Sequence, residues 1–212
     1  MIRFMVCFAA VAVLLALATL SLAQDFSADV VNLKRENSGS SKVYATKDKV
    51  RFEMSSEKQQ MGPSAIIIDE TQHSWIVLMA ERHMYMDAMP AMRKMPLVSQ
   101  FWRVQDVDDA CPQWKKAAEE SSSAKNWGSC TKVGADTVNG RSAVKYEGVS
   151  SKGDKGYVWI DRKLHCVIKT DETNGGMELR NIKEESQPAS LFEIPAGYTK
   201  FDMGMMMHQQ QQ

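Results

Sequence analysis

The sequence lacks a net charge. Its 26 lysine and arginine residues balance its 26 aspartate and glutamate residues over 212 positions. A chain without an excess of positive charge has no bulk electrostatic attraction to nucleic acid or to anionic membranes. The short basic run at Arg93 and Lys94 is typical of a solvated surface. We therefore expect no nucleic-acid partner.

Catalytic motifs are missing as well. The sequence contains no Gly-x-Ser-x-Gly nucleophile elbow, no phosphate-binding loop and no His-Glu-x-x-His zinc helix. Its four histidines are scattered, and none lies three or four positions from another, so a zinc site would need ligands from distant segments. Cys111 and Cys130 are too far apart for a redox Cys-x-x-Cys motif. We expect neither a cofactor nor an enzymatic activity.

The first residues predict export from the cytoplasm. Arg3 is followed by an apolar run that ends in Ser-Leu-Ala, which is typical of a signal peptide cleaved after Ala23. The apolar run is close to the length of a transmembrane helix, so a single anchoring helix is the alternative. We expect a periplasmic or secreted protein with a signal peptide over residues 1–23, one domain over residues 24–202 and a disordered methionine- and glutamine-rich tail over residues 203–212.

Cysteine is scarce, with four residues in the whole chain, and Cys7 falls within the predicted signal peptide. Cys111 and Cys130 flank a polar segment, and in an oxidising compartment we expect them to form a disulfide. Closing a loop of this size stabilises a fold by ~3 kcal/mol if the effect is entropic. Cys166 alternates with Leu164 and Ile168, which predicts a buried thiol that packs as a small apolar side chain.

Alternation of apolar and polar side chains dominates the rest of the sequence. Val50, Phe52 and Met54 fall on one face of a predicted strand whose other face is polar. Residues 73–81 are apolar at alternate positions on both sides, which predicts a central strand covered on both faces.

Two Asn-Gly pairs, Asn139–Gly140 and Asn174–Gly175, predict tight hairpin turns between consecutive strands. Roughly ten strands follow one another in this way, more than a flat twisted sheet holds. The sequence therefore predicts a mainly β protein with short helices (α+β), built on a curved antiparallel sheet or incomplete β-barrel.

The middle of the chain breaks the alternation. Within residues 89–124, three methionines recur every third position, and Val98 and Trp102 are four positions apart, both of which indicate helix. A second helix is predicted over residues 112–120, inside the expected disulfide loop. We expect these short helices to cover the concave side of the sheet as a lid.

The second half of the chain has a recognisable succession of turns and strands, over residues 130–148, 156–172 and 175–203. Its closing segment, SLFEIPAGYTK, is interpreted as a strand followed by Pro195, Gly197 and Tyr198. This pattern resembles secreted bacterial proteins of an uncharacterised domain family, related in form to the periplasmic lipoprotein carriers of the LolA/LolB-like superfamily.

The resemblance implies an incomplete antiparallel barrel whose hydrophobic cavity is covered by helices and, in the carriers, holds acyl chains. The carriers use an arginine on the side of the barrel that faces the lid. Arg51 is comparable in position, but the alternation places it on the face opposite Val50 and Phe52. The role of that arginine is therefore not transferred to Arg51.

The methionines give the most specific hypothesis about function. Methionine is unbranched and polarizable, so a methionine-lined surface can repack around apolar ligands of different shape. We predict a non-enzymatic protein that holds a lipid or acyl chain. The alternative is that the methionines only complete the hydrophobic core. The residues predicted to line the cavity are Phe52, Met54, Trp75, Met84, Met86, Met89, Met92, Met95, Phe101 and Trp102.

Two other functions are compatible with the sequence. Thioether and imidazole groups select Cu(I) and Ag(I), so the methionine clusters are also candidate metal ligands. An envelope scaffold that binds a partner protein without any small ligand is the third hypothesis. In each case we expect a monomer. The candidate metal ligands are His83, Met84, Met86, Met205, Met207 and His208.

Overall fold

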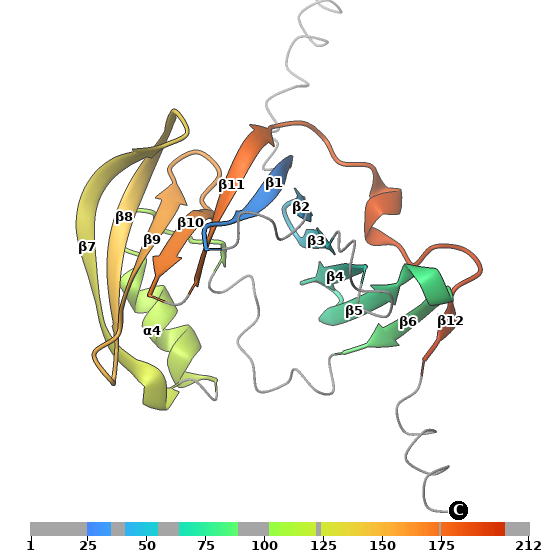
Figure 1. Cartoon of the computed structure of the whole chain (residues 1–212), viewed down its shortest axis with the longest axis horizontal. Coiled ribbons are helices and arrows are strands. Elements are labelled where there is room, and N and C mark those ends of the chain that lie inside the picture. The colour runs from blue at the N-terminus through green and yellow to red at the C-terminus, as the bar shows by residue number, and fades with distance from the viewer. Residues whose placement is uncertain are drawn as a thin grey trace, which may run out of the picture.

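The strands of the protein form one large sheet (Figure 1). The computed structural model describes residues 25–34, 41–54, 64–88, 102–121, 124–173 and 175–201. In this part of the chain, twelve strands are arranged in the order β12-β6-β5-β4-β3-β2-β1-β11-β10-β9-β8-β7. Their bounds are β1 (Phe26–Asn32), β2 (Ser41–Ala45), β3 (Lys49–Met54), β4 (Ala65–Asp69), β5 (Ser74–Met79), β6 (Met84–Asp87), β7 (Trp127–Val138), β8 (Arg141–Ser150), β9 (Lys155–Asp161), β10 (Val167–Glu172), β11 (Gly175–Lys183) and β12 (Thr199–Lys200).

The sheet is strongly curved and does not close. Its edges are β7 and β12, and among the described strands every neighbouring pair is antiparallel except β12 with β6. Figure 1 shows the strands bent around a concave side, with helix α4 (Cys111–Glu119) inside the curve, where it contacts β7 and where its Trp114 packs on Tyr146 of β8. The predicted curved antiparallel sheet is confirmed, with twelve strands instead of roughly ten.

Turn chemistry sets the β7–β8 hairpin. Asn139 and Gly140 have φ values of 49° and 78°, which are the two left-handed positions of a type I′ turn. The same turn was predicted at Asn174–Gly175, but Asn174 lies outside the described residues.

Residues that face one another across adjacent antiparallel strands project from the same side of the sheet. The registers place Val43, Phe52, Ile66, Val77 and Met86 in one row that crosses β2 to β6. This row lies on the side where Phe52 meets Trp102, which precedes α4, and it is therefore the concave side. The predicted alternation in β3 and β6 is confirmed.

The concave side of the other half of the sheet is filled by residues 102–110 and α4. Helix α4 has Pro112 in its first turn and buries Trp114, Ala117 and Ala118, which confirms the helix predicted over residues 112–120. Two short 3-10 helices, η1 (Ala80–Arg82) and η2 (Ala124–Asn126), connect neighbouring elements. The lid helix predicted from Met89 onward lies outside the described residues, apart from Trp102.

The cysteines are placed as predicted. Cys111 and Cys130 form a disulfide with their Cα atoms 5.6 Å apart, which joins the start of α4 to β7. Cys166 is free and fully buried. Burial raises the pKa of the Cys166 thiol to about 12, so it stays protonated and acts as part of the core.

The C-terminal segment crosses the convex side of β3 to β6 (Figure 1). Here the structure corrects the interpretation of SLFEIPAGYTK as a strand: Ala189–Phe192 is a 3-10 helix, η3, and only Thr199–Lys200 pairs, as β12. Phe192 packs against the apolar convex face of β4 and β5, and Arg51 Nη1 donates a hydrogen bond of 2.8 Å to the Leu191 carbonyl oxygen. Arg51 therefore does face away from Val50 and Phe52, and the convex side of β5 is covered.

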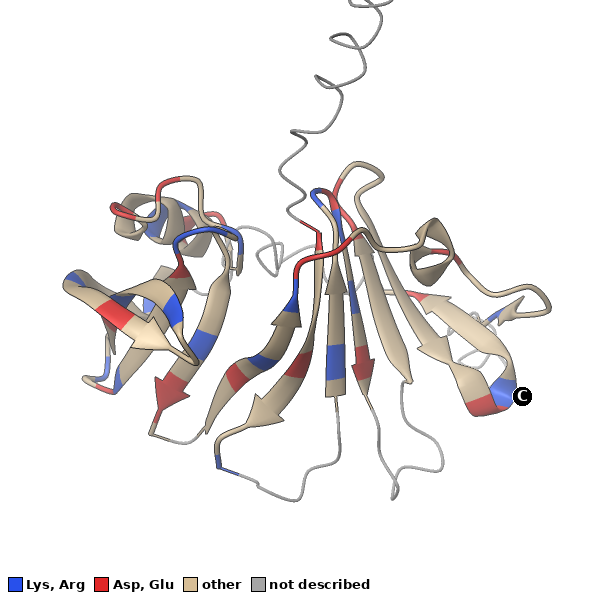
Figure 2. Cartoon of the chain, turned by 90° about the horizontal axis from the view of Figure 1, so that it is seen from above, with Lys and Arg blue, Asp and Glu red and all other residues tan. Residues whose placement is uncertain are grey.

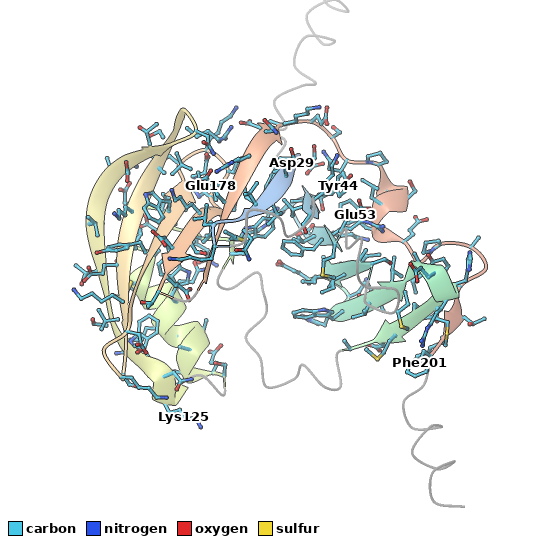
Figure 3. The ribbon with its side chains drawn as sticks, viewed as in Figure 1. Asp29, Tyr44, Glu53, Lys125, Glu178 and Phe201 are labelled. Carbon is cyan, nitrogen blue, oxygen red and sulfur yellow. A yellow bond between two sulfur atoms is a disulfide. The ribbon has the colours of Figure 1, made fainter. Side chains whose placement is uncertain are left out.

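Charged side chains are distributed without a strong excess of one sign. Figure 2 shows basic and acidic residues on the same strands. Among those labelled in Figure 3, Asp29, Tyr44, Glu53 and Glu178 lie along the convex side of the sheet.

No helix in the described part of the chain is long and apolar enough to cross a membrane. The predicted signal peptide and the predicted tail lie outside that part.

Candidate functional site: an aromatic cavity on the concave side

A cavity of about 790 Å³ lies between the concave face of β7 to β11 and the segment that carries Trp102 and α4. Its volume falls within the range of roughly 300–1,000 Å³ that is typical of small-molecule sites. Its wall comes from Phe52, Trp102, Trp114, Asn126, Trp127, Ser129, Cys130, Tyr146, Gly148, Val149, Ser150, Asp154, Lys155, Gly156, Tyr157, Val158, Val167, Thr170, Glu172, Thr173 and Met177.

The wall is unusually aromatic. Three of the five tryptophans in the sequence line it, together with two tyrosines and one phenylalanine. Aromatic rings offer large apolar surfaces with few rotatable bonds, so they form a wall that keeps its shape without a ligand.

Trp102 is held in this wall by a hydrogen bond and by contacts with two other rings. Its indole Nε1–H donates a hydrogen bond of 2.8 Å to the carbonyl oxygen of Val167, and its side chain is almost completely buried. The ring centroids of Phe26 and Phe52 each lie 5.8 Å from that of Trp102, in tilted contacts. Since its polar hydrogen is already bonded, Trp102 presents an apolar surface to the cavity.

Tyr146 ties α4 to the sheet. Its hydroxyl donates to the Val107 carbonyl oxygen at 2.8 Å and accepts from the Ala110 amide at 3.2 Å. Trp114 of α4 meets the Tyr146 ring edge to face, at 5.3 Å between centroids. Burial raises the pKa of the Tyr146 phenol, so the hydroxyl remains neutral and able to donate.

Two glycines leave space in the sheet that forms the cavity floor. Gly148 of β8 is opposite Gly156 of β9, and neither has a side chain to fill the concave face there. A Cβ atom placed on Gly148 would have nothing within 4 Å, whereas one on Gly156 would come within 3.0 Å of Glu172 Cγ. The open space beside Gly148 is thus available to a ligand.

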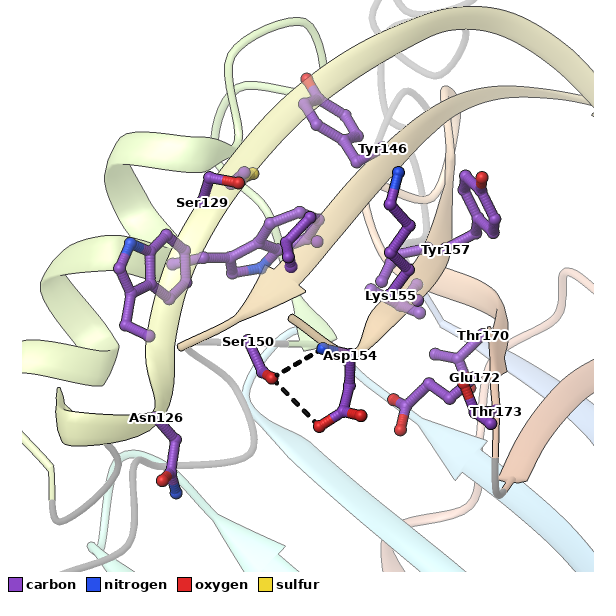
Figure 4. Close-up of a pocket in the computed structure, with 18 of the residues that line it drawn as sticks. Asn126, Ser129, Tyr146, Ser150, Asp154, Lys155, Tyr157, Thr170, Glu172 and Thr173 are labelled. Carbon is purple, nitrogen blue, oxygen red and sulfur yellow. Dashed lines mark hydrogen bonds between the residues drawn. The ribbon is translucent and has the colours of Figure 1, made fainter. Parts of the chain in front are cut away.

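Polar residues collect at one end of the cavity. Ser150 Oγ donates to Asp154 Oδ2 at 3.2 Å and accepts from the Asp154 amide at 3.1 Å (Figure 4). Glu172, at the end of β10, lies opposite Gly156 and is exposed. The amine of Lys155 lies 3.4 Å from a carboxylate oxygen of Glu147, which does not line the cavity.

The predicted binding residues divide into three groups. Phe52 and Trp102 line the cavity. Met54, Trp75, Met84 and Met86 do not line it, although Met54 and Met86 share the concave face with Phe52; Trp75 packs in a separate small core with Ile68 and Ala88. The remaining predictions lie outside the described residues: Met89, Met92, Met95 and Phe101.

Several lining residues were not predicted, above all Trp114, Trp127 and Tyr146. A signal for them was present in the sequence. Tyr146, Gly148 and Ser150 fall on one face of one strand, and Gly156 and Val158 fall on the same face of the next. The two glycines leave that face without side chains beside Tyr146 and Val158.

The candidate metal ligands are not tested by the structure. No group of three or more histidine, cysteine, aspartate or glutamate side chains gathers in the part of the chain that the structure describes. His83 packs against Tyr198, with ring centroids 5.6 Å apart, and Met84 lies opposite Met79. Met205, Met207 and His208 lie outside the described residues.

Comparison of the sequence with protein-family models and with curated proteins gives no match. Among solved structures, an uncharacterized conserved protein from Thermus thermophilus has a TM-score of 0.50 at 12% identity, over 84% of this chain and 89% of that one. This similarity shows a shared fold.

Two further structures are similar at lower scores. The Pseudomonas aeruginosa MucA/MucB complex matches with a TM-score of 0.45 at 14% identity, over 82% of this chain and 56% of that one. A putative outer membrane lipoprotein-sorting protein domain from Vibrio parahaemolyticus matches with a TM-score of 0.35 at 10% identity, over 80% of this chain and 89% of that one.

Proposed function

We propose that this protein is a non-enzymatic binding protein of the periplasm or the extracellular space, which holds one apolar or amphiphilic ligand in the aromatic cavity. The observation that carries the proposal is the cavity itself. It is lined by Trp102, Trp114 and Tyr146, and the hydrogen bonds of Trp102 and Tyr146 hold the wall in place. A lipid or another molecule with an alkyl chain fits this description.

Two features support a binding role for this wall. The polar atoms of Trp102 and Tyr146 are bonded within the protein, so an apolar ligand leaves none of them without a partner. The wall is also preformed, which lowers the entropy cost of binding. Each ligand CH₂ group that leaves water contributes ~0.8 kcal/mol, so an alkyl chain can bind without a charged contact.

A lipid ligand is also in keeping with the expected export of the chain and with its resemblance to the lipoprotein carriers. A protein partner in the envelope remains part of the proposal, because a carrier must deliver its ligand. The proposal does not depend on the methionine face, by which we mean the concave side of β3 to β6 that carries Met54, Met84 and Met86.

The test fills the cavity from the sheet side. In the variant Gly148→Leu, the new side chain starts from a Cβ position with nothing within 4 Å and extends into the cavity. Binding of the uncharged dye N-phenyl-1-naphthylamine, and its displacement by decanol, should weaken by roughly tenfold or more, since excluding two CH₂ groups forfeits about 1.6 kcal/mol. Fluorescence titration measures both.

The matched control is Thr131→Leu. Thr131 also lies in a strand and is exposed, but it is opposite Glu147 on the face of the sheet away from Gly148, and it does not line the cavity. This variant should bind like the wild-type protein. Equal binding by Gly148→Leu and the wild type would remove the cavity as the binding site.

A further inference from the structure

We infer that the cavity selects a ligand whose polar end carries a positively charged ammonium group, next to an apolar chain. This inference rests on the proposed function, since it specifies the chemistry of the ligand in the same cavity. Two independent features of the cavity point to it: the aromatic rings, and the sign of the charge at the polar end.

Aromatic rings attract cations. The faces of tryptophan and tyrosine rings are negative, and groups of such rings recognise quaternary ammonium ions. Trp127, at the start of β7, pairs with Ser150 at the end of β8. Ser150 in turn bonds to Asp154, so an aromatic ring and a carboxylate meet at the same end of the cavity.

Glu172 supplies a second carboxylate. It is the last residue of β10, the strand that pairs with β9. Glu172 is opposite Gly156, two residues after Asp154, and its Cγ lies 3.0 Å from the position of a Cβ on Gly156. The Glu172 side chain thus extends over the glycine floor toward the cavity (Figure 4). Within the described residues its carboxylate forms no hydrogen bond or ion pair.

Positive charge does not balance these two carboxylates. Lys155 is the one cation among the described lining residues, and its amine is paired with Glu147. Lys125 and Lys152, in the neighbouring turns, do not line the cavity. The polar end therefore carries a net negative charge beside Trp127, which favours an ammonium group and disfavours a carboxylate, sulfate or phosphate.

The test compares ligands that differ only in the head group. Decyltrimethylammonium, decanol and decyl sulfate are titrated below their micellar concentrations by isothermal titration calorimetry. The cationic ligand should bind about five- to tenfold more tightly than decanol, and decyl sulfate more weakly than decanol. The preference should decrease as salt is added, because the carboxylates are exposed.

Variants assign the preference to its residues. Glu172→Gln and Asp154→Asn should each reduce the preference for the cation, measured as the ratio of the decanol and decyltrimethylammonium dissociation constants in the same variant. The matched control is Asp171→Asn, which removes the same charge from the adjacent position of β10. Asp171 does not line the cavity, and its carboxylate lies 3.9 Å from the Lys34 amine.

A fourth ligand, decanoyl lysophosphatidylcholine, separates two sources of the ammonium group. Binding as tight as that of decyltrimethylammonium indicates a lipid head group, and weaker binding indicates a free amphiphilic amine.

The outcomes distinguish the two levels of the proposal. If decanol and the cation bind equally, the head-group inference is overturned and the binding function stands. If only decyl sulfate binds tightly, the inference is overturned because the cavity then prefers a negatively charged head group. If none of the three ligands binds, the proposed function fails with it.

Discussion

In the described part of the chain the buried polar residues are Asp69, Asp161 and Glu178, and each has specific partners. Asp69, only 7% exposed, accepts hydrogen bonds from the Thr71 hydroxyl and from the Thr71 and Gln72 amides, and its other oxygen lies 2.9 Å from the Lys49 amine. Burial raises the pKa of Asp69, but these hydrogen bonds and the Lys49 charge outweigh it and bring the pKa to about 2. The β4–β5 turn is therefore held by an ionised carboxylate.

This carboxylate should make stability depend on pH. Because its folded-state pKa lies below the ordinary value of 3.8, its contribution is complete above that pH and disappears as the pH falls toward 2. The wild-type protein should lose about 2 kcal/mol more unfolding free energy between pH 4 and pH 2 than Asp69→Asn does. Urea denaturation at several pH values measures this difference. Parallel pH curves for the two proteins would contradict the assignment.

The element that most directly shapes the cavity is α4. Its Trp114 forms part of the wall, and its position depends on the Tyr146 hydroxyl and on the disulfide between Cys111 and Cys130, of which Cys130 itself lines the cavity. Nine residues of helix are too short to be stable alone. The disulfide and the packing on β7 and β8 therefore fix this wall.

Removing the disulfide should affect both stability and binding. The bridge closes a sequence separation of 19 residues. The double variant Cys111→Ser/Cys130→Ser should lose ~3 kcal/mol of unfolding free energy and bind decanol more weakly. A reducing agent should change the wild-type protein in the same way and leave the double variant unchanged. Unaltered decanol binding in the double variant would show that α4 does not depend on the bridge.

The sequence predicts the strands and turns of this protein better than it predicts the residues that line the cavity. Alternation and the Asn139–Gly140 turn depend on local chemistry, so strands, their faces and the hairpin could be predicted. Which strands contribute to a cavity depends on the order β1-β11-β10, which joins the two ends of the chain. That pairing is non-local, and it brings Phe52 and Trp102 to residues of the second half that no periodicity connects with them.

The whole molecule uses the two halves of its sheet differently. Over β3 to β6, the C-terminal segment with η3 covers the convex side, where Phe192 packs on Ile67 and Leu78. Over β7 to β11, α4 and residues 102–110 cover the concave side and leave the aromatic cavity between themselves and the sheet. The methionines Met84 and Met86 lie in the first half, whereas the cavity lies in the second, to which the first half contributes Phe52 of β3.

The five tryptophans are natural reporters of this division. Trp102, Trp114 and Trp127 line the cavity. Trp75 lies in the small core beside the methionine face, and Trp159 donates a hydrogen bond of 2.8 Å to Asp136 without lining the cavity. The central claim, that the ligand occupies the aromatic cavity, therefore predicts which indole groups respond to binding.

The most direct measurement is an NMR titration of the indole Nε1–H signals with decanol, each signal assigned by a Trp→Phe variant. We predict that the signals of Trp102, Trp114 and Trp127 shift and that those of Trp75 and Trp159 do not. A shift of Trp75 alone would place the ligand on the methionine face that the sequence first suggested, and no shift in any signal would contradict a binding function for the cavity.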